Sequence, residues 1–498
     1  MSPDRIVVIG AGVGGLVAAL ELAARGMDVV VCESSAQPGG KMRQVQVGGR
    51  LLDAGPTVFT MKWVFEALFE QVGEVLADHL RLHKLQTLAR HVWGRGETAA
   101  DRFDLFADID RSADAIGVFA GAAEARRYRA FCQLTRSIYQ TLELPYLCAS
   151  RPHPLSLAWN VARGNPSGLA QLSPLGSMWS ELGRYFHNPR LRQLFGRYAT
   201  YCGSSPFNAT ATLMLVAHVE QEGVWSLEGG LHALAAKLAE LAEKKGATFR
   251  YGTCVSEILI RDGRTEGVRL ATGEVIDAAA VIFNGDSAAL AGGLLGGQAQ
   301  RATPPPRASQ RSLSAVTWNL VAPASGFPLA MHNVFFADDT QAEFDALFTQ
   351  GKLPADPTVY LCAQDHVEGQ QPDPQSAQPL FCLVNAPANA DQPNALTDGD
   401  IERAQNIMFA KLARCGLHLN TDGVRTTPAD FHRLFPATGG ALYGQVSHGW
   451  RSAFARPGAR SKIGGLYLAG GSAHPGAGVP MAALSGRQAV ASVLADLG

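Results

Sequence analysis

Residues 5–33, RIVVIGAGVGGLVAALELAARGMDVVVCE, contain the pattern that decides the fold. The apolar run over 5–9 predicts a buried parallel strand, and residues 16–25 predict a helix that ends at Gly26. A second apolar run over 27–32 predicts another strand. Together these elements predict a βαβ unit of about thirty residues, the building block of a doubly wound α/β sheet.

The turn between the first strand and the helix has the G-x-G-x-x-G spacing through Gly10, Gly12 and Gly15, with Gly14 beside them. These glycines permit a tight turn, close approach of the backbone to a pyrophosphate, and close packing of helix on strand. The helix N-terminus offers unpaired N–H groups to the phosphates. Glu33 ends the second strand at the offset where a carboxylate binds a ribose 2′-hydroxyl. The stretch therefore predicts a dinucleotide site.

The same stretch has a competing interpretation as a signal peptide or membrane span, because residues 6–24 carry almost no charge and follow Arg5. The fixed offsets of the glycines and the strand that follows argue against it. No other stretch approaches the roughly 20 apolar residues needed to span a bilayer. We therefore expect a soluble protein or one that lies on a membrane surface.

Composition narrows the possible partners. The 498-residue chain has 43 Lys and Arg against 44 Asp and Glu, which excludes the basic excess of a nucleic-acid-binding protein. Charged residues make up only 17% of the chain, which hints at an apolar ligand or membrane contact, since about 25% is usual. Its eight cysteines form no C-x-x-C pair and have no metal-site spacing, so we expect a reducing, cytoplasmic compartment and no metal.

The segment after Glu33 favours a flavin over a nicotinamide cofactor. A nicotinamide enzyme normally continues into another crossover helix here, whereas residues 37–43, QPGGKMR, bring a glycine pair and two cations. Residues 52–57, LDAGPT, then bend the backbone tightly. Both segments would let the chain wrap over a long cofactor. The candidate cofactor-binding residues in them are Gly40, Lys41, Arg43, Gly55, Pro56 and Thr57.

A third glycine-rich segment lies near the C-terminus. Residues 465–471, GLYLAGG, predict a strand that runs into glycines, and a helix begins near Met481. The N-terminus of such a helix, placed at the pyrimidine edge of an isoalloxazine ring, stabilises negative charge on a reduced flavin. This predicts a second cofactor contact, far from the first in sequence and near it in space. Its candidate residues are Gly470, Gly471, Gly478, Val479 and Pro480, the last of which suits a first helical turn.

These three motifs together resemble the flavin-dependent amine oxidase and phytoene desaturase superfamily, and most closely its bacterial carotenoid desaturases. Residues 466–480, LYLAGGSAHPGAGVP, match the C-terminal signature of that family almost throughout. Residues 205–207, 284–286 and 427–431 also match, so the resemblance spans essentially the whole chain. Within the family, the chain looks most like the 1-hydroxycarotenoid 3,4-desaturases of phototrophic bacteria.

The resemblance implies an α/β fold: a discontinuous Rossmann-like FAD-binding domain, a mixed-sheet substrate domain and a helical region. We assign residues 1–90, 221–300 and 437–498 to the FAD-binding domain. Residues 91–220 form the helical substrate- and membrane-facing region, and residues 301–436 the sheet of the substrate domain.

The implied activity is FAD-dependent desaturation of an acyclic carotenoid, with hydride transfer to the flavin and peripheral attachment to the cytoplasmic side of a membrane. Quinone or oxygen is the expected electron acceptor, because no second G-x-G-x-x-G suggests a nicotinamide site. The conjugated polyene delocalises positive charge, so a strong catalytic base is not obligatory and no catalytic residue is assigned. Arg151, His153 and His474 are candidates, the first two on a predicted mobile connection over 151–176.

Aromatic residues have two interpretations. Trp225, Trp318 and Phe431 are candidates for the wall of a substrate tunnel, against the alternative of ordinary core. Trp63 and Trp93, with neighbouring arginines at 90 and 95, are candidates for a membrane-facing patch.

Four other functions remain open. A carotenoid cis–trans isomerase shares the cofactor motifs but leaves the mass of its product unchanged, whereas desaturation removes two hydrogens. A phytoene desaturase differs only in its substrate. An amine oxidase needs an aromatic cage beside the flavin, and the C-terminal glycines lack the aromatic residue for it. A non-enzymatic escort protein for isoprenoids would not need flavin contacts at both ends of the chain.

Overall fold

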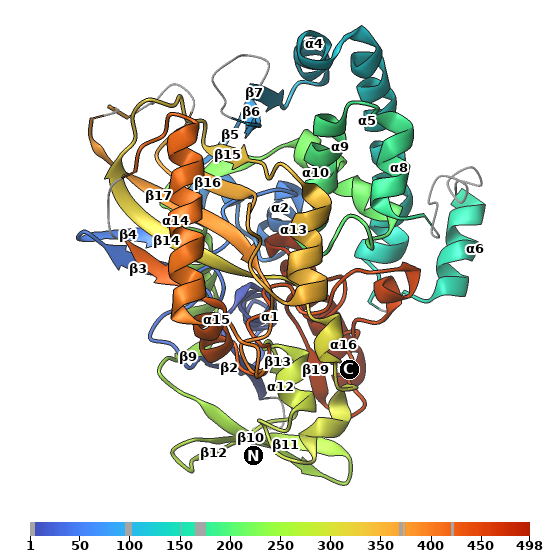
Figure 1. Cartoon of the computed structure of the whole chain (residues 1–498). Helices are drawn as coiled ribbons and strands as arrows, with labels where there is room; N and C mark the ends of the chain where they lie inside the picture. Colours follow the sequence, from blue (N-terminus) through green and yellow to red (C-terminus); the bar gives the residue numbers. More distant parts are fainter. Residues whose placement is uncertain are drawn as a thin grey trace.

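The computed structural model describes residues 5–94, 102–150, 152–164, 176–367, 372–373, 375–419 and 423–498. The predicted βαβ unit lies at the centre of a five-stranded parallel sheet (Figure 1). In spatial order its strands are β19 (Leu466–Leu468), β13 (Ala280–Phe283), β1 (Ile6–Ile9), β2 (Val29–Cys32) and β9 (Thr248–Arg250). Strands from the beginning, middle and end of the chain thus form one sheet.

Helix α1 (Val13–Ala23) explains why the first stretch is so apolar. Every one of its residues is buried, between α11 (Gly230–Lys244) and the C-terminal helix α16 (Val479–Leu497). Glu21 on α1 accepts a hydrogen bond of 2.8 Å from Arg487 on α16. A Cβ at Gly486 would lie 2.3 Å from the carbonyl oxygen of Gly14, so the two helices pack backbone to backbone. The ends of the chain are joined in this way.

An antiparallel meander extends from this half of the molecule. It consists of β10 (Val255–Arg261), β11 (Arg264–Leu270) and β12 (Val275–Asp277), and it lies at the bottom of Figure 1. The β10–β11 turn is formed by Asp262 and Gly263, with φ of 50° and 77°. Positive φ at both turn residues is the hairpin geometry that an Asp-Gly pair predicts.

The second large sheet is mixed. Its spatial order is β18 (Val424–Thr426), β14 (Ser314–Pro323), β17 (Ala377–Ala386), β16 (Val359–Ala363), β15 (His332–Phe335), β6 (Thr87–Val92) and β7 (Arg102–Phe106). All neighbouring pairs are antiparallel except β15 with β6. Apolar residues of α14 (Asp398–Arg414) share a hydrophobic cluster with this sheet. Strands β6 and β7 therefore belong to the mixed sheet, although the predicted boundary at residue 90 falls within β6 and assigns β7 to the helical region.

The helical region lies in the upper right of Figure 1. Its helices are α4 (Ile109–Ala120), α5 (Ala122–Leu142), α6 (Pro154–Gly164), α8 (Met178–Tyr185), α9 (Pro189–Gly196) and α10 (Leu215–Glu222), with a π-helix at Glu143–Leu147 and a 3₁₀ helix at Arg197–Cys202. Phe131, Phe186 and Phe195 form its aromatic centre, with ring centroids 4.6–5.0 Å apart. The predicted mobile connection is wrong for residues 154–164, which form α6. Arg151 and residues 165–175 lie outside the described residues.

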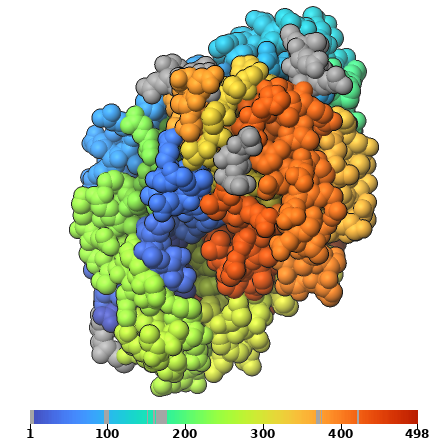
Figure 2. Space-filling model, turned by 60° about the vertical axis from the view of Figure 1, so that its left-hand side comes forward, coloured from blue at the N-terminus to red at the C-terminus, as the bar shows by residue number. Residues whose placement is uncertain are grey.

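Shorter elements complete the described chain. They are the hairpin β3 (Gln44–Val47) with β4 (Arg50–Asp53), the pair β5 (Leu82–Lys84) with β8 (Trp225–Leu227), and helices α2 (Lys62–Gln71), α3 (Leu76–His79), α12 (Ser287–Ala291), α13 (Thr340–Asp345) and α15 (Pro428–Leu434). Figure 2 shows a face on which N-terminal segments in blue lie between green segments and orange segments from beyond residue 400. None of the described helices is long and apolar enough to cross a membrane.

Candidate active site

A cavity of about 1100 Å³ is lined by residues from both large sheets and the helical region. This exceeds the roughly 300–1,000 Å³ of a typical small-molecule pocket. The predicted cofactor residues meet in its wall, although they come from both ends of the chain. Those that line it are Gly10, Gly12, Gly14, Glu33, Gly40, Lys41, Arg43, Gly55, Pro56, Thr57, Gly470, Gly471, Gly478, Val479 and Pro480. The remaining one, Gly15, packs α1 against the first turn, since a Cβ there would lie 2.2 Å from the Gly10 carbonyl oxygen.

The start of α1 is open to the cavity. Its N-cap is Gly12, which supplies no side-chain hydrogen bond to the free backbone N–H groups. Asn284 braces this turn by donating a 3.1 Å hydrogen bond to the Gly10 carbonyl oxygen. A Cβ at Gly12 would lie only 2.9 Å from the same amide. The arrangement suits a phosphate group, which binds uncapped helix N-termini where the backbone is bare.

Glu33 is held rigidly at the end of β2. Its Oε2 accepts a 2.6 Å hydrogen bond from the Ala11 N–H, and its Oε1 accepts one of 2.8 Å from the Ser35 N–H. The residue is 6% exposed and faces the cavity. A carboxylate oxygen has further lone pairs, so Glu33 keeps acceptor capacity for ribose hydroxyls.

Lys41 and Arg43 link the N-terminal loop to β18 and to the segment that follows it. The Lys41 Nζ donates a 2.5 Å hydrogen bond to the Leu442 carbonyl oxygen and lies 5.3 Å from the ring centroid of Phe435. Arg43 donates a 2.7 Å hydrogen bond to the Thr426 hydroxyl. Burial is the main cause that lowers the pKa of both cations. Cations kept in a buried wall are suited to an anionic ligand.

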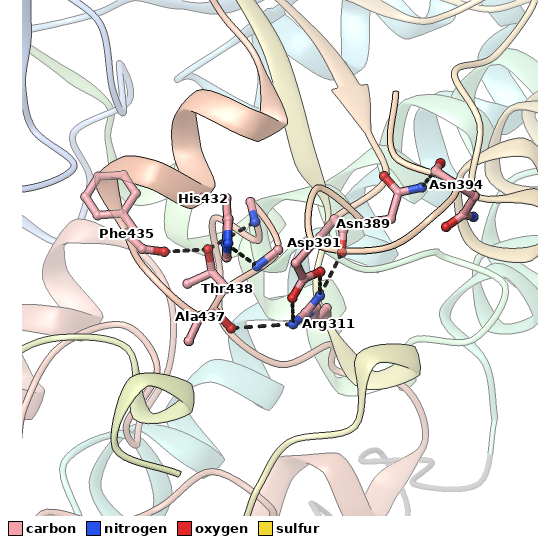
Figure 3. Close-up of polar contacts among 11 residues, drawn as sticks. Arg311, Asn389, Asp391, Asn394, His432, Phe435, Ala437 and Thr438 are labelled. Carbon is pink, nitrogen blue, oxygen red and sulfur yellow. Dashed lines mark hydrogen bonds and ion pairs between the residues drawn. The ribbon is translucent and has the colours of Figure 1, made fainter. Parts of the chain in front are cut away.

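The segment from Phe435 to Leu442 is itself anchored by a polar cluster (Figure 3). Arg311 forms hydrogen bonds of 2.5 and 2.7 Å with the two carboxylate oxygens of Asp391. The same guanidinium reaches the Ala437 carbonyl oxygen at 3.5 Å. Thr438 donates a 2.7 Å hydrogen bond to the Phe435 carbonyl oxygen. These contacts hold Phe435 and Leu442 in the cavity wall.

The start of α16 forms the other uncapped terminus in the cavity. Gly478 is its N-cap, with φ of 114° and no side-chain hydrogen bond, and Pro480 lies in the first turn. The neighbouring Arg456, which sequence reasoning missed, donates hydrogen bonds to three carbonyl oxygens, at 2.8 Å to Gly471, 3.0 Å to Tyr443 and 2.7 Å to Gln445. The sequence contains no motif that would identify Arg456, because its partners are backbone carbonyl groups of segments that no side-chain pattern specifies.

Together these features fit FAD better than a mononucleotide. Two bare helix N-termini, one carboxylate and several glycines without room for a Cβ share one cavity. The clearest is Gly55, where a Cβ would lie 1.9 Å from the Lys41 carbonyl oxygen. The turn at residues 10–15, Glu33 and Lys41 would hold the adenosine and pyrophosphate part of FAD. Residues 55–57 and the start of α16 would hold its isoalloxazine ring.

None of the described catalytic candidates reaches the cavity wall. His474 is 2% exposed, and its Nε2 donates a 2.8 Å hydrogen bond to the Tyr146 carbonyl oxygen. Burial lowers the pKa of His474 to about 4, so the ring is neutral and serves as a structural donor. His153 is exposed before α6, where its Nδ1 accepts a 3.3 Å hydrogen bond from the Leu155 N–H. Arg151 lies outside the described residues.

Away from the glycines, the cavity wall becomes apolar. This part is lined by Leu142, Leu147, Leu157, Leu213, Val216, Val219, Phe336, Phe344, Phe381, Trp450 and Phe454. Of the three aromatic tunnel candidates, only Phe431 lines the cavity. Trp318 on β14 is 2% exposed and donates a 2.8 Å hydrogen bond to Gln405 on α14, and Trp225 lies outside the wall.

The predicted membrane-facing patch is wrong for its described residues. Trp93 is 5% exposed and donates a 2.8 Å hydrogen bond to Gln193 in the core. Trp63 is half-buried and bonds to Tyr139 at 3.2 Å. Arg90 pairs with both carboxylate oxygens of Asp104 instead of facing a membrane. Arg95 lies outside the described residues.

Comparisons with known proteins agree with this geometry. A family model described as flavin-containing amine oxidoreductase matches residues 13–494. A hydroxyneurosporene desaturase from Rubrivivax gelatinosus is 51% identical over 497 residues, 99% of this chain and 94% of that protein. One from Cereibacter sphaeroides is 42% identical, over 99% of this chain and 98% of that protein. An oxidoreductase of known crystal structure from Methanosarcina mazei has a TM-score of 0.60 at 16% identity, over 99% of this chain and 100% of that one, which confirms the fold.

Proposed function

Because the chain belongs to the family of flavin-containing amine oxidoreductases, we propose that its cavity holds FAD at the glycine-rich end and a hydroxylated acyclic carotenoid at the apolar end. The protein is an FAD-dependent carotenoid desaturase. We assign hydroxyneurosporene as the substrate, since the two relatives that are 51% and 42% identical are named for it. The resemblance to 1-hydroxycarotenoid 3,4-desaturases points to the 3,4 bond as the one that becomes double. The observation that carries the proposal is the change of the cavity wall from glycines and cations to aliphatic and aromatic side chains.

Desaturation removes two hydrogens from a saturated C–C bond beside a polyene, and FAD, when bound, supplies the hydride acceptor. The work of the protein is to bind and orient both molecules. Leucine and phenylalanine side chains exclude water around the hydrocarbon. The N-terminus of α16 presents the positive end of its dipole to the cavity and would stabilise negative charge there.

The test is an assay of product mass. The FAD-loaded protein is incubated with liposomes that contain hydroxyneurosporene, neurosporene or phytoene, with a quinone under anaerobic conditions or with oxygen. We expect hydroxyneurosporene to lose two hydrogens with either acceptor and its absorption to shift to longer wavelength, because one more double bond joins the polyene. A product of unchanged mass would identify an isomerase, and conversion of phytoene alone would identify an early desaturase; either outcome contradicts the proposal.

We also propose that the enzyme attaches to the cytoplasmic surface of a membrane through α6 and the neighbouring π-helix. Leu144, Leu155 and Trp159 are exposed by 75%, 76% and 64%. Leu157, on the same helix as the last two, lines the cavity, so a route from the lipid would be short. Arg163 lies 5.9 Å from the Trp159 ring and would meet anionic headgroups. Figure 1 shows α6 at the edge of the molecule.

The membrane proposal predicts the outcome of a liposome flotation experiment. Replacing both Leu155 and Trp159 by serine should lower the partition coefficient onto anionic liposomes by about 100-fold or more. The reason is that burying each such side chain contributes about 1.5–3 kcal/mol. Val118→Ser is the matched control, because Val118 is 91% exposed on α4 and does not line the cavity. Equal flotation of the double variant and the wild type would contradict this docking surface.

A further inference from the structure

Charged groups interrupt the apolar part of the cavity, and Arg197 is one of them. Arg197, at the start of the 3₁₀ helix that follows α9, lines the cavity, and its Cζ lies 5.5 Å from the ring centroid of Tyr201 and 5.6 Å from that of Tyr360. Among the described residues, no carboxylate lies within 4.0 Å of its nitrogens. A guanidinium buried without a direct ion pair is costly. Among the described residues, its hydrogen-bond partner is the Tyr201 hydroxyl. The remaining N–H donors are available for a ligand that can accept hydrogen bonds.

A carboxylate faces the same part of the cavity. Glu220 on α10 is 5% exposed and also lines the wall. Its Oε2 accepts a 2.5 Å hydrogen bond from the Tyr198 hydroxyl, and its Oε1 accepts one of 2.5 Å from the Tyr201 hydroxyl. Burial raises the pKa of Glu220, and the positive charge of Arg197 opposes this rise. Arg197 and Glu220 thus interact electrostatically across a gap that is wider than an ion pair, and the Tyr201 hydroxyl contacts both groups.

This pair lies beside the loop that is predicted to contact the cofactor. Tyr360, whose ring neighbours Arg197, has its hydroxyl 2.7 Å from the Thr57 hydroxyl and 2.8 Å from His332 Nδ1. Thr57 belongs to the tight bend at 55–57. In a 1-hydroxycarotenoid, the carbon that bears the hydroxyl is only two positions from C3, so the hydroxyl must be bound close to the 3,4 bond that reacts. A polar pair next to Thr57 meets that requirement.

We propose that Arg197 and Glu220 bind the C1 hydroxyl of the substrate, and that they select hydroxylated carotenoids over unsubstituted ones. The guanidinium donates to the hydroxyl oxygen, and the Glu220 carboxylate accepts the hydroxyl hydrogen. A hydroxyl group suits the gap because it is both donor and acceptor. An unsubstituted chain leaves both charged groups without that partner, which is the basis of strong discrimination in polar sites. This inference rests on the proposed function.

The test measures how kcat/KM for hydroxyneurosporene compares with kcat/KM for neurosporene, in the FAD-loaded enzyme with both substrates in liposomes. The wild type should favour the hydroxylated substrate. Arg197→Met should lower this ratio by about 10- to 100-fold, the value of a hydrogen bond to a charged group, mainly through a higher KM for hydroxyneurosporene. Arg197→Lys should restore part of the ratio. Arg184→Met is the control, because the Arg184 side chain is 72% exposed and lies outside the cavity wall.

Outcomes of the experiment separate the inference from the proposed function. Suppose that the wild type converts hydroxyneurosporene and that Arg197→Met lowers kcat/KM by the same factor for both substrates. Arg197 then has only a structural role, and the inference is overturned. If the wild type does not convert hydroxyneurosporene, the proposed function fails and the inference fails with it. Glu220→Gln provides a second measurement in case Arg197→Met does not fold, because glutamine keeps the shape of the glutamate side chain. If Glu220→Gln left the ratio of the two kcat/KM values unchanged, the inference would also be overturned.

Discussion

Replacing Gly55 by alanine is expected to abolish FAD binding and to lower desaturation by at least about 100-fold. A Cβ at this position would lie 1.9 Å from the Lys41 carbonyl oxygen and 3.4 Å from the Met42 Cα, both of them backbone atoms that a rotamer change cannot move away. The two glycine-rich segments after β2 would have to separate, and a displacement of about 1 Å in a binding site can cost about 100-fold in rate. Because φ of Gly55 is not in the left-handed region, the expected effect is purely steric.

The measurement is the ratio of flavin absorbance to protein absorbance after purification, followed by kcat/KM for hydroxyneurosporene in the presence of added FAD. Gly297→Ala is the matched control: no atom lies within 4 Å of the added Cβ, so full flavin content is expected. A Gly55→Ala protein that retained flavin as well as this control would show that the loop does not enclose the cofactor.

Replacing Arg456 by methionine is expected to lower the free energy of unfolding by about 3–5 kcal/mol. Its guanidinium donates to the carbonyl oxygens of Gly471, Tyr443 and Gln445, so the variant leaves three carbonyl groups without this partner. The same change removes the link between residues 443–445 and the glycines at 470–471. Because Tyr443 and both of these glycines line the cavity, flavin should be lost as well. Urea unfolding of the wild type and the variant, both prepared without flavin, measures the first effect. Flavin absorbance of the purified proteins measures the second.

Arg460→Met is the control for this variant. Arg460 pairs with Asp496 at 2.8 Å, but both side chains are 40–49% exposed, so the loss should stay below about 1 kcal/mol. Arg456→Lys should be intermediate, because one ammonium group does not reproduce the planar fork of a guanidinium. If Arg456→Met cost no more than the control, the three carbonyl contacts would contribute nothing to stability.

Local signals were sufficient for the first βαβ unit and for one hairpin turn. The glycine spacing and apolar runs of residues 5–33 predicted β1, α1 and β2, and the Asp262–Gly263 pair predicted the turn between β10 and β11. Such elements are readable because hydrophobic periodicity and turn chemistry act over a few residues. The resemblance of the two glycine-rich ends to carotenoid desaturases then predicted the fold class and the FAD cofactor, both of which the family match confirms.

Local signals failed where a residue depends on distant partners. Trp93 follows a short strand and looked like an exposed aromatic, but β6 pairs with β15, far along the chain, and buries it. His474 lies inside a cofactor motif, yet its ring turns toward the backbone of Tyr146 and not toward the cavity. In both cases, tertiary packing decided the role of a residue type that fits several environments.

The amino-acid sequence by itself determined the parallel βαβ unit, the glycines that leave room for a dinucleotide, and the family to which they point, because these depend on residues close together in the chain. Only the tertiary structure decided that Arg197, Glu220 and Tyr360 share one polar part of a largely apolar cavity, and that Arg456 joins three backbone segments. The physical reason is that contacts between residues far apart in sequence form when the two sheets and the helical region pack together, and no local pattern encodes them.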